Sequence, residues 1–199
     1  MEVKARNFLV NPMSELKFSI VPLRDVIQAK GRLDANVFNM EARTVISKLQ
    51  SDDFKTWSIT DSAITNKVYY PGRFKRKYVS ESVGLPFILP SQISDLEPKP
   101  YKWIAGLSDK QMVELVANEG DILLTRSGTI GQSVIVGKRL AGCVLSDDLI
   151  RINVNDQYRG YLYAFLRSKT GQLLLKTSNY GAVVQHIVVR PEISRHLLW

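Results

Sequence analysis

Apolar positions recur along the chain with two periods, one typical of helices and one typical of strands. Near-helical spacing predicts a short helix over 21–27, a second over about 37–50 and a third over 108–117. The stretch 158–176 is also helical in pattern, with an interruption near Thr170-Gly171. Gly31 is expected to end the first helix, and Ser108 to Gln111 resembles a capping box. Asp34 or Asn36 is the expected N-cap of the second helix.

Short runs rich in β-branched and aromatic residues predict strands, most of them in the second half of the chain. They lie within 51–80 and at 84–89, 121–126, 130–136, 143–146, 149–154 and 181–189. The predicted fold class is therefore α+β, with a twisted mixed or antiparallel β core and several peripheral helices. We expect a single domain over 1–199, in which residues 1–19 have a mixed composition and are free to fray.

The stretch from Gly120 to Gly131 is the central feature of the predicted strand region. Three apolar residues lead into Thr125-Arg126-Ser127, and a second apolar run follows the glycines. The pattern predicts a strand, a tight turn and a returning strand, with the turn displaying hydroxyls and a guanidinium. A phosphate-cradling loop is the alternative, but the Lys-Ser/Thr ending of such loops is missing, so a hairpin turn is favoured.

Composition narrows the classes of protein. Hydrophobic residues make up 45% of the chain, enough for a folded core, and no apolar run approaches the roughly 18 residues that would span a bilayer. The lone Cys143 excludes an internal disulfide and fits a reducing, cytoplasmic setting. The net charge is +8, of which residues 66–199 carry +7. Such an excess suggests a polyanionic partner, most often nucleic acid. A basic protein whose excess charge only aids solubility is an equal alternative on charge alone.

The segment 66–79, here called the basic–aromatic segment, has the composition of a nucleic-acid contact. It holds five basic residues, four aromatic residues and no acidic residue. Lys and Arg neutralise phosphates, Arg also reads guanine, and aromatic rings stack on bases or support a loop. An exposed hairpin with its aromatics facing the core is the alternative, although a solvated face normally mixes charges of both signs.

Residue chemistry favours binding over catalysis. Asp147 and Asp148 are adjacent on the chain, so they are more typical of a turn or a strand start than of one metal site. Only His186 and His196 are available for acid–base chemistry. The sequence shows no glycine-rich cofactor loop of a methyltransferase. We therefore expect no catalytic residue, no metal and no cofactor.

The candidate DNA-binding residues form two groups. In the basic–aromatic segment, the cations are expected to neutralise phosphates, with one or two of them reaching bases, while the tyrosines shape the loop or stack. The members of this group are Lys67, Tyr69, Tyr70, Arg73, Lys75, Arg76 and Lys77. Hairpin turns supply the second group, which consists of Arg126, Ser127, Thr129, Lys138 and Arg139.

Several stretches resemble, in order, the target recognition domains of type I restriction-modification specificity subunits. Gly120 to Gly131 is similar to the "GDIL-x-x-R-x-G-T-x-G" signature of that family. The other similar stretches are 32–38 ("R-x-D-x-x-Y/F"), 72–79 ("G-R-F-x-R-x-Y-V") followed by the strand 84–88, 146–152 ("S-x-x-L-I-R-I"), 161–172 ("Y-L-Y-x-x-L…G-Q") and 181–187 ("G-S-x-x-Q-x-I"). Together they cover about residues 20–193.

The resemblance implies a non-catalytic subunit that reads double-stranded DNA and joins a methyltransferase (modification) subunit to a restriction subunit. In that family, two recognition domains are separated by long spacer helices. This sequence covers one such domain and stops at Trp199, where a spacer helix would be expected, so it is either one half of a longer subunit or a shortened member. Two alternatives stay open: a nucleic-acid-acting enzyme, such as a nuclease or modification enzyme, and a basic protein-interaction module.

Overall fold

The computed structural model describes residues 20–29, 31–33, 35, 37–49, 51, 56–127, 129–177, 179–180 and 186–187. The chain divides into two compact units, Met1–Leu33 and Asp34–Trp199. In the first unit, α1 (Leu23–Gln28) is the element described. It is followed by Gly31 at a φ of +75°, a conformation that glycine adopts without steric cost.

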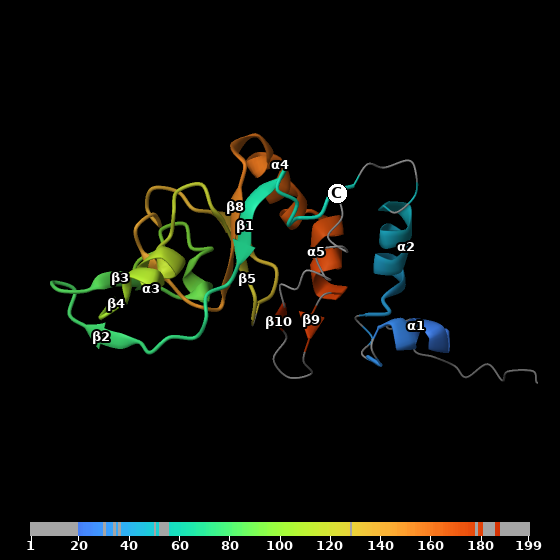
Figure 1. Ribbon diagram of the computed structural model, residues 1–199, viewed down its shortest axis with the longest axis horizontal. Helices are drawn as coiled ribbons and strands as arrows, with labels where there is room; N and C mark the ends of the chain where they lie inside the picture. Colours follow the sequence, from blue (N-terminus) through green and yellow to red (C-terminus); the bar gives the residue numbers. More distant parts are fainter. Residues whose placement is uncertain are drawn as a thin grey trace, which may run out of the picture. The chain divides into compact units, whose positions relative to one another are not determined.

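The second unit is built on two four-stranded sheets (Figure 1). In strand order, the first sheet contains β1 (Thr65–Tyr69), β8 (Leu149–Val154), β5 (Ile122–Thr125) and β6 (Ser133–Ile135), all antiparallel. The second sheet contains β2 (Lys77–Val79), β4 (Lys102–Ala105), β3 (Leu85–Ile88) and β7 (Val144–Leu145), of which β3 and β7 are parallel. Two short strands, β9 (Asn179–Tyr180) and β10 (His186–Ile187), form a separate antiparallel pair.

The helices of the second unit precede or connect the strands. They are α2 (Met40–Leu49), the 3₁₀ turn η1 (Pro90–Gln92), α3 (Asp109–Leu115), α4 (Asp156–Arg167) and α5 (Lys169–Thr177). α4 packs on the first sheet at β6 and against α5, and α5 packs in turn against α2, while α3 packs on β7 of the second sheet. In α3, Ser108 Oγ accepts a hydrogen bond from the Gln111 amide N–H at 3.3 Å, and the Gln111 side chain bonds back to the Ser108 amide, which completes the predicted capping box.

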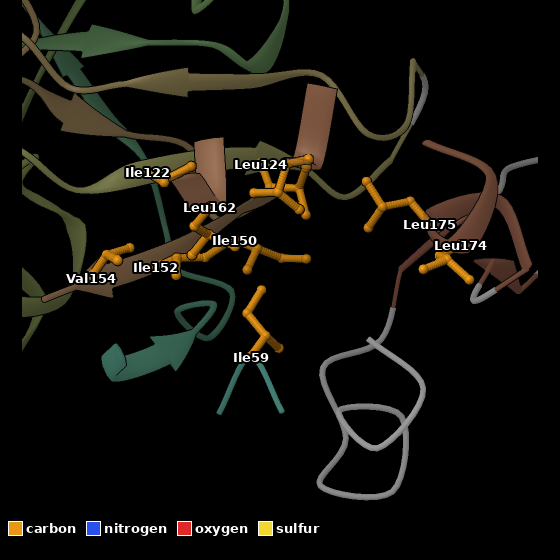
Figure 2. Packing of buried hydrophobic residues seen from close by; sticks show 10 residues of the cluster. Ile59, Ile122, Leu124, Ile150, Ile152, Val154, Leu162, Leu174 and Leu175 are labelled. Atoms are coloured by element: carbon orange, nitrogen blue, oxygen red, sulfur yellow. The ribbon is translucent and has the colours of Figure 1, made fainter. Parts of the chain in front are cut away.

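The core lies on both faces of the first sheet. Alternate side chains of β5 and β8, including Ile122, Ile150 and Ile152, pack toward α4 and α5 (Figure 2). Leu123 follows Ile122 on β5 and points to the opposite face of the sheet, where it joins a second buried cluster with Leu145 of β7. All four residues of β5 are buried because helices cover one face and the second sheet covers the other.

The structure confirms the predicted α+β class and the strand–turn–strand unit of β5 and β6. It also corrects several element boundaries. The second helix starts at Met40 rather than near residue 37, and its cap is Asn39, whose Oδ1 accepts the Ala42 N–H at 3.1 Å. The predicted caps Asp34 and Asn36 lie outside the described residues, as do residues 181–185 of the predicted last strand.

Two further differences concern a break and an omission. The break between α4 and α5 falls at Ser168, whose Oγ accepts the Gly171 N–H at 3.0 Å, so Gly171 lies in the first turn of α5 rather than in the break. Strand β4 was not predicted. Its four residues pair with both β2 and β3, and such a short run gains strand structure from these neighbours rather than from its own pattern.

Gly171 permits the close packing of α5 on the end of α4. A Cβ at this position would lie 2.1 Å from the carbonyl oxygen of Phe165, a backbone atom that cannot move aside. We expect Gly171→Ala to lower the free energy of unfolding by about 2–3 kcal/mol, measured by urea denaturation. Gly160→Ala, within α4, is the matched control because nothing lies within 4 Å of its Cβ, and it should be neutral or stabilising. Equal effects of the two substitutions would contradict the packing assignment.

Candidate nucleic-acid interface

The basic–aromatic segment joins the two sheets. Its first part forms β1, an edge strand of the first sheet, and its last part forms β2, an edge strand of the second sheet. Residues 70–76 form the loop between them and carry no regular hydrogen-bonded structure. Figure 1 shows this connection running from β1 to β2. A side-chain contact from the loop reaches a distant part of the chain, since Arg76 bonds to Asp147.

Arg76 is held by Asp147, which lies in the connection from β7 back to β8. Its Nη2 donates to Asp147 Oδ1 at 2.6 Å, and the carboxylate side chain is only 10% exposed. The guanidinium also lies over the rings of Phe74 and Phe87, at 5.7 and 5.3 Å from their centroids. Burial disfavours the charged form of Arg76, but the hydrogen bond and charge of Asp147 outweigh it, so the pKa of Arg76 is raised.

Arg126 is held in the same way by Asp148, the residue that follows Asp147 in the sequence. Its Nη2 lies 3.2 Å from Asp148 Oδ1, and its guanidinium lies over the ring of Tyr70 at 4.6 Å from the centroid. We call Tyr70, Arg76, Arg126, Asp147 and Asp148 the junction. It connects the loop 70–76, the β5–β6 turn and the β7–β8 connection, which are far apart in sequence.

The β5–β6 turn is closed by the hydroxyl of Thr125. Thr125 Oγ1 donates to the Thr129 carbonyl at 2.5 Å and accepts the Gln132 N–H at 3.0 Å, while the Thr125 side chain itself is buried. Gly131 has a φ of +85°. Of the two hydroxyl-bearing residues predicted here as contacts, Thr129 is exposed and Ser127 is half-buried. Thr125 is therefore part of the turn's framework, and Thr129 is presented to solvent.

The remaining predicted cations are exposed. Within the described part of the chain, the following residues form no ion pair: Lys67, Arg73, Lys75, Lys77 and Lys138. The Lys67 ammonium lies 4.1 Å from the ring centroid of Tyr69, whose pKa is raised mainly by burial. Arg139 instead pairs with Glu97 at 3.1 Å, on the surface. The structure thus separates cations available to an anionic partner from those already paired.

Arg151 is a key residue that sequence reasoning did not select. Its side chain is 1% exposed on β8, and its Nη atoms donate to the carbonyls of Leu149, Leu145 and Leu115 at 3.1, 3.2 and 3.3 Å. Burial lowers the pKa of Arg151 to about 10, so the guanidinium stays charged at neutral pH. The residue ties β8 of the first sheet to β7 of the second and to α3. The signal in the sequence that could have identified Arg151 is that it is a single arginine within a mostly apolar predicted strand.

The described residues contain neither a metal-binding cluster nor a membrane-spanning helix. No group of three or more His, Cys, Asp or Glu side chains in those residues is arranged to hold a metal ion. No helix in the same part of the chain is long and apolar enough to cross a membrane.

No protein-family model and no curated protein match the chain. Among solved structures, it is similar to the S subunit of a type I restriction-modification system from M. genitalium, with 9% identity and a TM-score of 0.44 over 68% of this chain and 31% of that one. The HsdS subunit from Thermoanaerobacter tengcongensis gives 18% identity and a TM-score of 0.46 over 88% and 45%. A chain from a structure on complex assembly and conformational transition of the type I R-M system has 17% identity and a TM-score of 0.41. The match covers 88% of this chain and 46% of that one.

The chain spans less than half the length of these three structures. All three TM-scores lie below 0.5, and all three identities lie below 25%.

Asp147 is expected to matter for stability more than a surface carboxylate. We expect Asp147→Ala to lower the free energy of unfolding by about 2 kcal/mol, because it leaves the partly buried Arg76 guanidinium without its acceptor. Glu97→Ala removes the partner of Arg139 from a pair whose side chains are 59% and 66% exposed, and should cost less than about 1 kcal/mol. Thermal and urea unfolding of both variants measure the difference. A loss at Asp147 no larger than that at Glu97 would show that the junction adds nothing to stability.

Proposed function

We propose that this chain is a sequence-specific double-stranded DNA-binding domain with no catalytic activity of its own, the target recognition domain of a type I restriction-modification specificity subunit. The observation that carries the proposal is the loop 70–76 with its neighbouring strands. There, Arg73, Lys75 and Lys77 are exposed and unpaired within the described chain, while Arg76 is anchored by Asp147. A loop held at its base with free cations along it suits contact with phosphates at fixed positions.

The ordered sequence motifs support the same assignment. They extend over most of the chain, and the one around Gly120 to Gly131 coincides with the β5–β6 hairpin, whose turn presents Thr129 beside the junction. In the proposed complex, the exposed cations neutralise phosphates, and side chains of the loop and turn reach base edges. The proposed protein partners are the methyltransferase (modification) subunit and the restriction subunit of the same system.

Selection from a pool of random DNA duplexes tests the proposal. The protein is titrated against the pool at two salt concentrations, and the retained duplexes are sequenced. We expect enrichment of a motif of a few base pairs and an affinity that falls as salt rises. Salt-sensitive retention without any enrichment would contradict sequence-specific recognition. Absence of retention at both salt concentrations would contradict DNA binding altogether.

A further inference from the structure

A second basic–aromatic segment lies next to the first in the fold. Lys99, Pro100, Tyr101, Lys102 and Trp103 contain two cations, two aromatic rings and no acid. Most of this stretch leads into or forms β4, which pairs antiparallel with β2. The pairing places two stretches with the composition of nucleic-acid contacts side by side at one edge of the second sheet. The function proposed above uses only the first of them.

An open groove of about 420 Å³ lies where β2 and β4 meet. The residues that line it are Tyr78, Val79, Ser80, Glu81, Tyr101, Lys102 and Trp103. Three of these are aromatic. The rings of Tyr101 and Tyr78 are the most accessible, with 73% and 49% of these residues exposed.

The walls of the groove are fixed by the fold. Val79 and Trp103 are register partners across β2 and β4, and a Cβ on Gly84 would lie 2.5 Å from the Val79 side chain and 2.7 Å from Trp103 Cβ. The absence of a side chain at Gly84 therefore lets the connection from β2 to β3 lie close against Val79 and Trp103. Before β4, the Lys99 carbonyl accepts a hydrogen bond from Gln92 Nε2 at 2.5 Å, and Gln92 is buried. The approach to Tyr101 is thus anchored from within the protein.

We propose that this groove binds an unpaired DNA base, which stacks on the exposed ring of Tyr101. The inference rests on the proposed function only in taking DNA as the partner. Proteins that bind single-stranded nucleic acids place exposed aromatic rings beside cations, because every base offers a flat face for stacking and every phosphate needs a counter-charge. Lys102 supplies that charge, with its Nζ 4.9 Å from the Tyr78 ring centroid.

Glu81 defines which base the groove prefers. A carboxylate repels phosphate, so it does not suit a groove for the DNA backbone alone. It accepts a hydrogen bond from an exocyclic amino group, which cytosine carries and thymine lacks. The groove therefore binds an unpaired base that has an exocyclic amino group, and cytosine is the smallest such base.

The test compares three dye-labelled oligonucleotides of equal length by fluorescence anisotropy: dodecadeoxycytidine, dodecathymidine and an abasic twelve-mer with the same phosphates. We expect the intact chain to bind the cytidine oligonucleotide at least about 10-fold more tightly than the abasic one. Thymidine should bind with intermediate affinity. Equal affinity for the cytidine and abasic chains would overturn the proposal, because only the backbone would then be recognised.

Variants locate the binding. Tyr101→Ala should weaken cytidine binding by about 5- to 100-fold, Tyr101→Phe should keep it, and Glu81→Ala should remove the preference over thymidine. The matched control is Tyr161→Ala, at a tyrosine that is 66% exposed on α4, and it should bind as the intact chain does. Undiminished binding by Tyr101→Ala, or a loss of the same size in Tyr161→Ala, would overturn the assignment.

The same variants separate this inference from the proposed function. Tyr101→Ala keeps Arg73, Lys75 and Lys77, so it should still select duplex DNA from a random pool. Duplex selection without cytidine binding in the intact chain would overturn the groove alone. Cytidine binding that is sensitive to Tyr101→Ala, without duplex selection, would support the groove and contradict the proposed function.

Discussion

Reversing the charges of Arg73, Lys75 and Lys77 to glutamate is expected to lower the affinity for duplex DNA by at least about 100-fold. All three side chains are exposed and form no ion pair in the described chain, so each is free to neutralise one phosphate. Reversal both removes an attraction and adds a repulsion. The slope of log affinity against log salt concentration should also fall in magnitude by about 3, which titrations at several salt concentrations measure.

A second triple variant separates position from net charge. Lys48, Lys110 and Lys169 are exposed lysines on α2, α3 and α5, outside the candidate interface. Their reversal changes the net charge by the same amount and should weaken binding only slightly. If the two triple variants lose equal affinity, DNA is attracted by the overall charge and the loop has no special role.

Replacing Arg151 by methionine is expected to lower the free energy of unfolding by about 3 kcal/mol. Methionine fills similar space but leaves the carbonyls of Leu115 and Leu145 without the donors that reach them from Arg151. Because those carbonyls belong to α3 and β7, the substitution should also loosen the contact between the two sheets. Urea denaturation measures the loss, and a change in m-value would reveal the loosening.

Arg139→Met is the control for that experiment. Arg139 is a surface residue paired with Glu97, so its replacement should cost less than about 1 kcal/mol. If Arg151→Met proved as stable as the original chain, the cost of burying the guanidinium would equal the gain from its hydrogen bonds. Such an outcome is known for buried ion pairs replaced by apolar residues. Here, however, the partners are neutral carbonyls, which cannot be removed with the arginine.

The junction divides the predicted contact residues by role. Arg76 and Arg126 each have a carboxylate partner within the protein, so a DNA phosphate would have to compete with Asp147 or Asp148 for them. The pair at Asp147 is the shorter and has the more buried carboxylate, whereas Arg126 is the more buried of the two arginines. We expect both arginines to act mainly by fixing the loop 70–76 and the β5–β6 turn, and the exposed cations to make the phosphate contacts.

Local features of the sequence determined much of the fold. Apolar and β-branched runs marked β5, β6 and β8, because a strand buried on one or both faces requires such residues at successive or alternate positions. Ser108 and Gln111 marked the start of α3 because a capping box involves only residues within one turn. The concentration of positive charge in the basic–aromatic segment was likewise visible in the sequence alone.

Only the tertiary structure decided which of those charges are free. The segment contains no acid of its own, yet Arg76 has a partner in Asp147, 71 residues further along the chain. Adjacent Asp147 and Asp148 were expected at a turn or strand start, but their two arginine partners depend on how the sheets are joined. Strand β4 and the burial of Arg151 depend on the same joining. Periodicity and composition act over a few residues, whereas ion pairs and sheet edges are set by segments that meet only in the folded chain.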